Sequence, residues 1–155
     1  MSFIIRKAKL TDVPAIFALL KDLANQGLLL PRSYADIYEM LQTFYVAKSE
    51  PDAMILAGVG ALQITWEDLA EVRSLAVAEE YRMQGLGRGL TEAIEAEARS
   101  LGVRRMFSLT YKPGFFEKMG YRRISLESLP KKIWTVCINC IHYPNCLEIP
   151  MGKEL

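Results

Sequence analysis

Glycines and arginines lie close together at the start of a long amphipathic segment, in a pattern that could hold phosphate. An apolar run from Val72 to Val77 predicts a β-strand before them, and the periodicity from Leu90 to Leu101 predicts an α-helix after them. Glycine lets a backbone approach a ligand closely, while the free N–H groups and the dipole of a helix start favour an anion. Permanent positive charge from arginine adds to this attraction. We therefore predict an anion-binding loop at Arg82, Met83, Gln84, Gly85, Leu86, Gly87 and Arg88.

Two other phosphate-binding motifs do not match the spacing of these glycines. The glycines could also mark an ordinary helix start without a ligand. The spacing G-x-G-x-G is not the dinucleotide fingerprint, and a P-loop would need a Lys-Ser or Lys-Thr pair. The stretch from Arg82 to Gly87 reads Arg-x-x-Gly-x-Gly and resembles the acetyl-CoA pyrophosphate loop of the GNAT superfamily of N-acetyltransferases. The resemblance implies acetyl-CoA as the acetyl donor. It also implies cofactor contacts from the preceding strand, at Leu75, Ala76 and Val77.

Attack of an amine on a thioester needs a neutral amine, a stabilised oxyanion and a proton for the departing thiolate. The resemblance implies Glu71 as the base, directly or through water; the alternative is a polar residue on the solvent face of a strand. Many GNAT enzymes use a tyrosine acid in the short helix, where this chain has Phe116, which we expect at the cofactor. Thr110 and Tyr111 are the replacement candidates for the acid, and the thiolate could also leave without one.

A narrower resemblance, to the acetyltransferase domain of N-acetylglutamate synthase, covers nearly the whole chain. Its segments are Gln26 to Ser33, Glu71 to Val77, Phe107 to Thr110, Phe116 to Tyr121, and Leu129-Pro130. In that family the arginine of Gly-x-Leu-x-x-Arg-Ser binds the amino acid, which implies this role for Arg32. We expect the remaining substrate contacts at Leu30, Arg73 and Ser74. The implied reaction is acetylation of the α-amine of an amino acid, L-glutamate, as in the first step of arginine biosynthesis.

Other acceptors stay open. The family offers basic residues to the substrate near the end of its domain. The corresponding stretch here, from Thr135 to Cys146, has His142 as its one candidate cation. This difference weakens the case for glutamate more than the case for amino acids in general. A GNAT enzyme could instead acetylate a protein N-terminus or a polyamine. A module that senses acetyl-CoA or an amino acid without turnover is the alternative outside enzymes, and Phe116 in place of tyrosine supports it.

Three cysteines lie close together, at Cys137, Cys140 and Cys146, with His142 between them. Free thiols, a structural zinc site and a disulfide are all compatible with this spacing. Acyl transfer from CoA needs no metal, so we assign none to the active site.

Length, charge and composition limit the number of domains, the kinds of partner and the cellular location that we expect. The chain has 155 residues and a net charge of +1, so we expect one domain over residues 1–155 and no nucleic-acid partner. It has no signal peptide and no apolar stretch long enough to span a membrane, so we expect a cytoplasmic protein without a membrane partner. Its expected partners are its small-molecule substrates, and it could form a homodimer.

The elements that must position these residues alternate along the chain in the order of the GNAT fold. This order predicts an α/β fold with a mixed, mostly antiparallel sheet, helices on both faces, and two strands splayed apart at the cofactor cleft. The predicted strands are Phe3 to Lys7, Tyr45 to Lys48, Ala53 to Thr65, Ala70 to Val77, Arg105 to Tyr111 and Tyr121 to Ile124. The predicted helices run from an N-cap at Thr11 to Asn25, from a capping box at Ser33 and Asp36 to Phe44, from Leu90 to Leu101, and from Gly114 to Met119.

Overall fold

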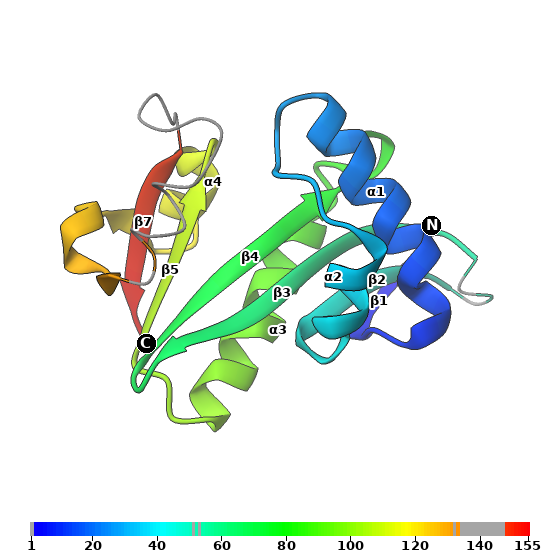
Figure 1. Cartoon of the computed structure of the whole chain (residues 1–155). Helices are drawn as coiled ribbons and strands as arrows, with labels where there is room; N and C mark the ends of the chain where they lie inside the picture. Colours follow the sequence, from blue (N-terminus) through cyan, green and yellow to red (C-terminus); the bar gives the residue numbers. More distant parts are fainter. Residues whose placement is uncertain (1, 51, 53, 132, 134–147) are drawn as a thin grey trace.

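The computed structural model describes residues 2–50, 52, 54–131, 133 and 148–155, and these form a seven-stranded sheet in the order β1-β2-β3-β4-β5-β7-β6. Neighbouring strands are antiparallel except for β4 and β5, which are parallel. The predicted mixed, mostly antiparallel sheet is confirmed (Figure 1). The strands are β1 (Phe3–Lys7), β2 (Phe44–Ser49), β3 (Leu56–Trp66), β4 (Leu69–Val77), β5 (Arg105–Thr110), β6 (Arg122–Arg123) and β7 (Ile149–Glu154).

Helices cover both faces of the sheet, as predicted (Figure 1). On one face α1 packs over β2, β3 and β4, and its buried Ile16 shares a core with Phe44 and Val59. On the other face α3 buries Ile94 against Leu62 and Val72. The helices are α1 (Val13–Asn25), α2 (Tyr34–Glu39), α3 (Leu86–Ser100) and α4 (Pro113–Lys118), with short 3₁₀ turns at Leu10–Asp12, Leu41–Thr43, Glu79–Tyr81 and Leu126–Ser128.

The signals for the helix ends are partly confirmed. At α2, Ser33 Oγ accepts from the Asp36 N–H at 3.1 Å, and the Asp36 carboxylate accepts from the Ser33 N–H at 3.3 Å, so the capping box is present. Gly27 follows α1 with φ +74°, the left-handed conformation of a C-terminal glycine. The predicted N-cap at Thr11 is wrong, because Thr11 lies within a 3₁₀ turn and Asp12 precedes the helix.

Helix α2 is shorter than predicted and α3 is longer. Met40 ends α2 after Glu39, and a 3₁₀ turn follows in which Thr43 Oγ1 donates to the Met40 carbonyl at 2.6 Å. Helix α3 begins at Leu86 rather than at the predicted Leu90. Its glycines allow close packing, since a Cβ on Gly89 would lie 2.5 Å from the Ile5 side chain.

Strands β4 and β5 part shortly after they meet. Their parallel register covers three pairs and ends at Glu71 and Phe107, and beyond it the two strands diverge (Figure 1). A bulge accompanies the divergence, because Ser74 and Leu75 both lie opposite Gly60 and Ser74 has φ +55°. Bulges bend the strand that carries them. The predicted splay of these two strands is confirmed.

Strand β7 is absent from the prediction. It pairs with β5 on one side and β6 on the other, so it lies inside the sheet. Gly152 fits against Ile124, whose Cγ2 would lie 2.9 Å from a Cβ at that position. The predicted strand from Tyr121 to Ile124 is reduced to the two residues of β6.

Candidate active site

The loop between β4 and α3 has the geometry expected of an anion site. Met83 and Gly85 take left-handed conformations, with φ +66° and +79°. Gly85 is the N-cap of α3, and the first N–H groups of a helix have no acceptor within it. No heavy atom lies within 4 Å of a Cβ built on Gly85, so the space beside it is open. The backbone donors and the helix dipole therefore meet in one accessible place.

Charged and exposed side chains surround this loop. Arg82 is half-buried and its Nε donates to the Val77 carbonyl at 3.2 Å, which occupies one of the backbone groups expected to face the cofactor. Arg88 is exposed, with its Nη1 3.8 Å from a Glu92 oxygen, so its charge is available at the first turn of α3. Met83 and Gln84 are exposed beside them.

Glu71 is buried and paired, which excludes the alternative of a residue on the solvent face. Its side chain is 10% exposed, and Arg73 donates to Oε1 from Nη2 at 2.9 Å and from Nε at 3.1 Å. Burial raises the pKa of Glu71, and the charges of Arg73 and Arg32 oppose that rise without cancelling it. In the part of the chain that the structure describes, the hydrogen bonds of Glu71 all reach Oε1. Oε2 is therefore able to accept a proton.

Arg32 lies close to this pair. Its Nε is buried and has no hydrogen-bond partner among the described residues. Burial lowers the pKa of Arg32, and the charge of Arg73 lowers it further, while Asp36 and Glu71 act in the opposite direction. The fold thus brings together two guanidinium groups and two carboxylates: Arg32 before α2, Asp36 in α2, and Glu71 with Arg73 in β4.

Comparisons with known proteins agree with this geometry. The acetyltransferase (GNAT) domain family matches residues 41–123, which include β4, the loop and α3. The chain belongs to this family. It is an acetyl-CoA-dependent N-acetyltransferase, and the GNAT fold accounts for its parallel, diverging strands.

Individual GNAT relatives cover most of the chain. An uncharacterized N-acetyltransferase of Chlorobaculum tepidum is 41% identical over 151 residues, 97% of this chain and 96% of that protein. An amino-acid acetyltransferase of Mycobacterium tuberculosis is 34% identical over 78% of this chain and 69% of that protein. In structure, N-acetylglutamate synthase from Neisseria gonorrhoeae complexed with coenzyme A and N-acetyl-glutamate superposes with TM-score 0.86 and 27% identity, over 100% of this chain and 35% of that one.

The other predicted site residues lie in β4, in the segment between α1 and α2, and at the start of α3. Ser74 lies in the bulge, half-buried, and Leu30 is 38% exposed in the segment between α1 and α2. Leu75 and Val77 are half-buried, whereas the side chain of Ala76 belongs to the core under α1 and that of Leu86 to the core under α3. Ala76 and Leu86 can therefore reach a ligand mainly through their backbone.

Helix α4 meets the GNAT loop through Phe115 rather than Phe116. A Cβ on Gly87 would lie 3.1 Å from Phe115 Cε1, so this glycine is needed for packing as well as for ligand approach. Phe116 is 3% exposed, and its ring lies edge-on to Phe115 and Tyr121, with centroids 5.1 Å apart in each case. It has almost no surface left for the cofactor that we expected it to contact.

The two candidates for the general acid lie at the end of β5, where Thr110 is its last residue and Tyr111 follows it. Thr110 Oγ1 accepts from the Lys112 N–H at 2.8 Å, which leaves the hydroxyl hydrogen able to donate. Tyr111 is half-buried and has a partner of its own. A hydroxyl held in this way can donate a hydrogen bond to a departing thiolate, although threonine is a poor acid.

Sequence reasoning missed one polar residue of the site, Ser108, and one contact of a residue that it did predict, Arg73. Ser108 is buried in β5, and its hydroxyl donates to the Val72 carbonyl at 3.0 Å, where the strands part. A serine inside an apolar strand was the signal for it. Arg73 was expected at the substrate, but its ion pair with Glu71 was not foreseen; side chains two residues apart share one face of a strand.

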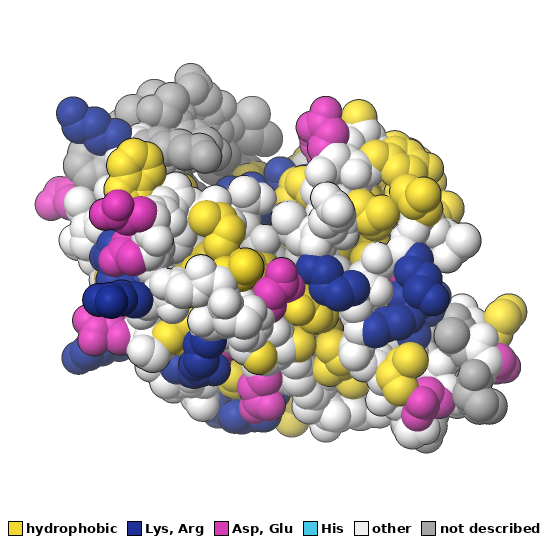
Figure 2. All heavy atoms as spheres, turned by 90° about the horizontal axis from the view of Figure 1, so that it is seen from below, with side chains coloured by type: hydrophobic (Ala, Val, Ile, Leu, Met, Phe, Trp, Pro, Cys, Tyr) yellow, Lys and Arg dark blue, Asp and Glu magenta, His cyan; other side chains and the backbone are white. Residues whose placement is uncertain are grey.

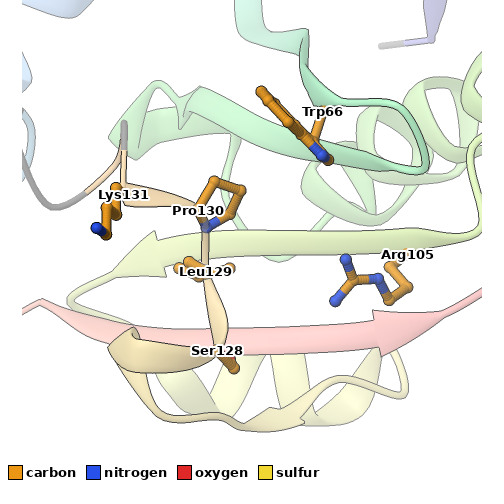
Figure 3. A pocket seen from close by; sticks show the side chains of 6 residues that line it. All are labelled: Trp66, Arg105, Ser128, Leu129, Pro130 and Lys131. Carbon is orange, nitrogen blue, oxygen red and sulfur yellow. The ribbon is translucent and has the colours of Figure 1, made fainter.

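A separate hollow of about 450 Å³ lies at the other ends of these strands (Figure 3). Trp66 ends β3 and Arg105 begins β5, and the hollow is therefore distant along both strands from the loop. Arg105 is already bound to Asp68, with two N–H···O distances of 3.2 Å. The lining residues are Trp66, Arg105, Ser128, Leu129, Pro130 and Lys131.

Basic and acidic side chains are interspersed over the face in Figure 2. Among the residues that the structure describes, no helix is long and apolar enough to cross a bilayer. The predicted thiol cluster of Cys137, Cys140 and Cys146 lies outside the described residues, as does His142.

Proposed function

We propose that this chain transfers the acetyl group of acetyl-CoA to the α-amine of an amino acid, and that the amino acid is L-glutamate. The observation that carries the proposal is the buried Nε of Arg32, which has no hydrogen-bond partner among the residues that the structure describes and lies beside the pair formed by Glu71 and Arg73. Arg73 is already paired with Glu71, and the charges of Asp36 and Glu71 act on Arg32 without a hydrogen bond to its Nε from any described residue. A buried arginine donor without a partner favours a carboxylate ligand, because such a ligand satisfies both the charge and the hydrogen bond.

In this proposal Glu71 is the general base. Arg73 holds Oε1, and Oε2 accepts a proton from the substrate ammonium, directly or through one water. The neutral amine then attacks the thioester carbonyl, and the C–N bond forms. The C–S bond breaks, the nitrogen gives up its extra proton, and a proton ends on the sulfur, so that coenzyme A leaves as the thiol. Thr110 or Tyr111 donates a hydrogen bond to the sulfur as it departs. Burial raises the pKa of Glu71, which makes it a stronger base toward an ammonium group.

Relatives support an amino acid as the acceptor. Proteins named amino-acid acetyltransferase match 78% to 83% of this chain, and the superposed N-acetylglutamate synthase holds coenzyme A and N-acetyl-glutamate. We further propose that the reaction is the first step of arginine biosynthesis and that it takes place in the cytoplasm.

A thiol-release assay with acetyl-CoA and each of the twenty amino acids tests the proposal. Glutamate should give the highest kcat/KM, and its α-amide should lose most of that rate because it lacks the main-chain carboxylate. A preference for glutamine would move the acceptor to another amino acid. Release with polyamines or peptides alone would remove amino acids as the substrate class, and no release with any amine would indicate a binding module.

A further inference from the structure

Ser108 occupies the point at which β4 and β5 separate. The last residue pair in their register is Glu71 with Phe107, so Val72 and Ser108 are the first positions beyond it. At these positions the backbones no longer pair with each other, and the Ser108 hydroxyl spans the gap to the Val72 carbonyl at 3.0 Å.

Few other donors can replace the Ser108 hydroxyl at the Val72 carbonyl. Val72 is 2% exposed and Ser108 is 4% exposed, so bulk water does not reach either group freely. A buried carbonyl without a donor is costly, and parallel strands would normally satisfy it with a backbone N–H from the neighbouring strand. Here a side chain supplies the donor, and it reaches further from its own backbone than an N–H does. The Val72 carbonyl therefore has a hydrogen-bond donor at the position where the two strands begin to diverge.

The bulge on β4 acts from the other side of the same point. Ser74, two residues after Val72, has φ +55° and lies in the bulge, and a bulge bends the strand that carries it. The bulge therefore sets the direction of the opening, and the hydroxyl of Ser108 sets the residue at which it begins.

We propose that Ser108 is a positioning residue that fixes where the acetyl-CoA cleft opens, and hence how deeply the pantetheine arm enters between β4 and β5. It acts through Val72 and need not touch the ligand. Loss of its hydroxyl leaves the Val72 carbonyl to find a donor from the β5 backbone, which pulls the strands together and shortens the opening.

Calorimetric titration of coenzyme A against the purified chain tests this proposal, because it does not depend on the identity of the amine. Ser108→Ala should weaken binding by about tenfold, the equivalent of one hydrogen bond. Ser108→Thr and Ser108→Val fill nearly the same volume and differ in the hydroxyl, so the threonine variant should bind more tightly than the valine variant by a similar factor. This comparison remains valid if both variants are less stable than the wild type.

Ser49→Ala is the matched control. Ser49 is 3% exposed and is the last residue of β2, which β3 and β4 separate from β5, and its hydroxyl accepts from the Ile55 N–H at 3.0 Å. It should lower the melting temperature without changing coenzyme A affinity. Equal affinities for the threonine and valine variants, wild-type affinity for Ser108→Ala, or an equal loss in Ser49→Ala would each overturn the proposal.

Discussion

Arg73 binds a single carboxylate oxygen of Glu71, through two nitrogens at 2.9 and 3.1 Å. The contact opposes the effect of burial on the pKa of Glu71 and leaves the second oxygen for proton transfer. The pair therefore sets the lower limit of the pH range in which Glu71 is a base.

Arg73→Met should move the acidic limb of the pH profile of kcat/KM to higher pH. The arginine lowers the pKa of Glu71, so its loss raises that pKa further, and the deprotonated base is then lost at a higher pH as the solution is acidified. Arg105→Met removes another ion-paired arginine, at the far end of β5, and should leave the limb in place. If the acidic limb of Arg73→Met lies at the same pH as that of the wild type, Glu71 is not the group whose deprotonation the profile reports.

Glu71→Gln should lower kcat at neutral pH by roughly 10²–10⁴, since it removes the general base and keeps the shape of the side chain. Affinity for coenzyme A should stay near that of the wild type, measured by calorimetry on the same preparation. A loss of two- or threefold in kcat would assign the proton to water or to another residue.

Gly85→Asp should abolish most coenzyme A binding, whereas Gly85→Asn should retain much of it. Both residues tolerate the φ of +79° better than other side chains, and the space beside the glycine is open, so the pair differs mainly in charge. Repulsion of the pyrophosphate should make the aspartate variant roughly 10- to 100-fold weaker than the asparagine variant. Equal affinities in titration would place the anion elsewhere. Gly87 is less suitable for this test, because a side chain there also presses on Phe115.

Arg32→Ala should raise the KM for glutamate by about 10- to 100-fold, the value of a charge-assisted hydrogen bond, and leave the KM for acetyl-CoA nearly unchanged. Arg32→Lys should recover part of the loss, because the ammonium keeps the charge but not the paired donors. Steady-state kinetics with each substrate varied in turn checks this. An unchanged glutamate KM in Arg32→Ala would count against the carboxylate assignment.

The loop was predictable from sequence because its chemistry depends on residue types at fixed spacing. The long helix was predicted to begin late, since Gly87 and Gly89 disfavour helix in isolation; they lie in it because α3 packs closely on Phe115 and Ile5. Strand β7 was missed because Pro150 and Gly152 are poor strand formers, and pairing on both sides outweighs that preference. The contact of Ser108 with Val72 needs the tertiary fold, since 36 residues separate them.

Asp12→Asn tests an interaction that supports the fold rather than the site. Burial alone would raise the pKa of Asp12, but hydrogen bonds from Arg6, the Lys9 backbone and Lys48 outweigh it and lower the pKa to about 2. The carboxylate therefore contributes about 2 kcal/mol of stability above pH 4, which is lost as the pH falls toward 2. Urea unfolding across this range should show a lower and flatter profile for the asparagine variant. If the free energy of unfolding depends on pH in the same way in the wild type and in Asp12→Asn, the Asp12 carboxylate does not contribute this stability.

The short parallel pairing between β4 and β5 divides the sheet into two groups of strands. One group is β1 to β4, and the other is β5, β7 and β6. Three residue pairs are few, so the two groups can open as separate units in hydrogen exchange. A ligand lying between the strands pairs with the backbone as an extra strand would, and joins the two units. We therefore expect the amides of β5 to exchange faster than those of β3 in the free protein, and the difference to narrow when coenzyme A is bound. The substrate is then part of the tertiary structure as well as a reactant.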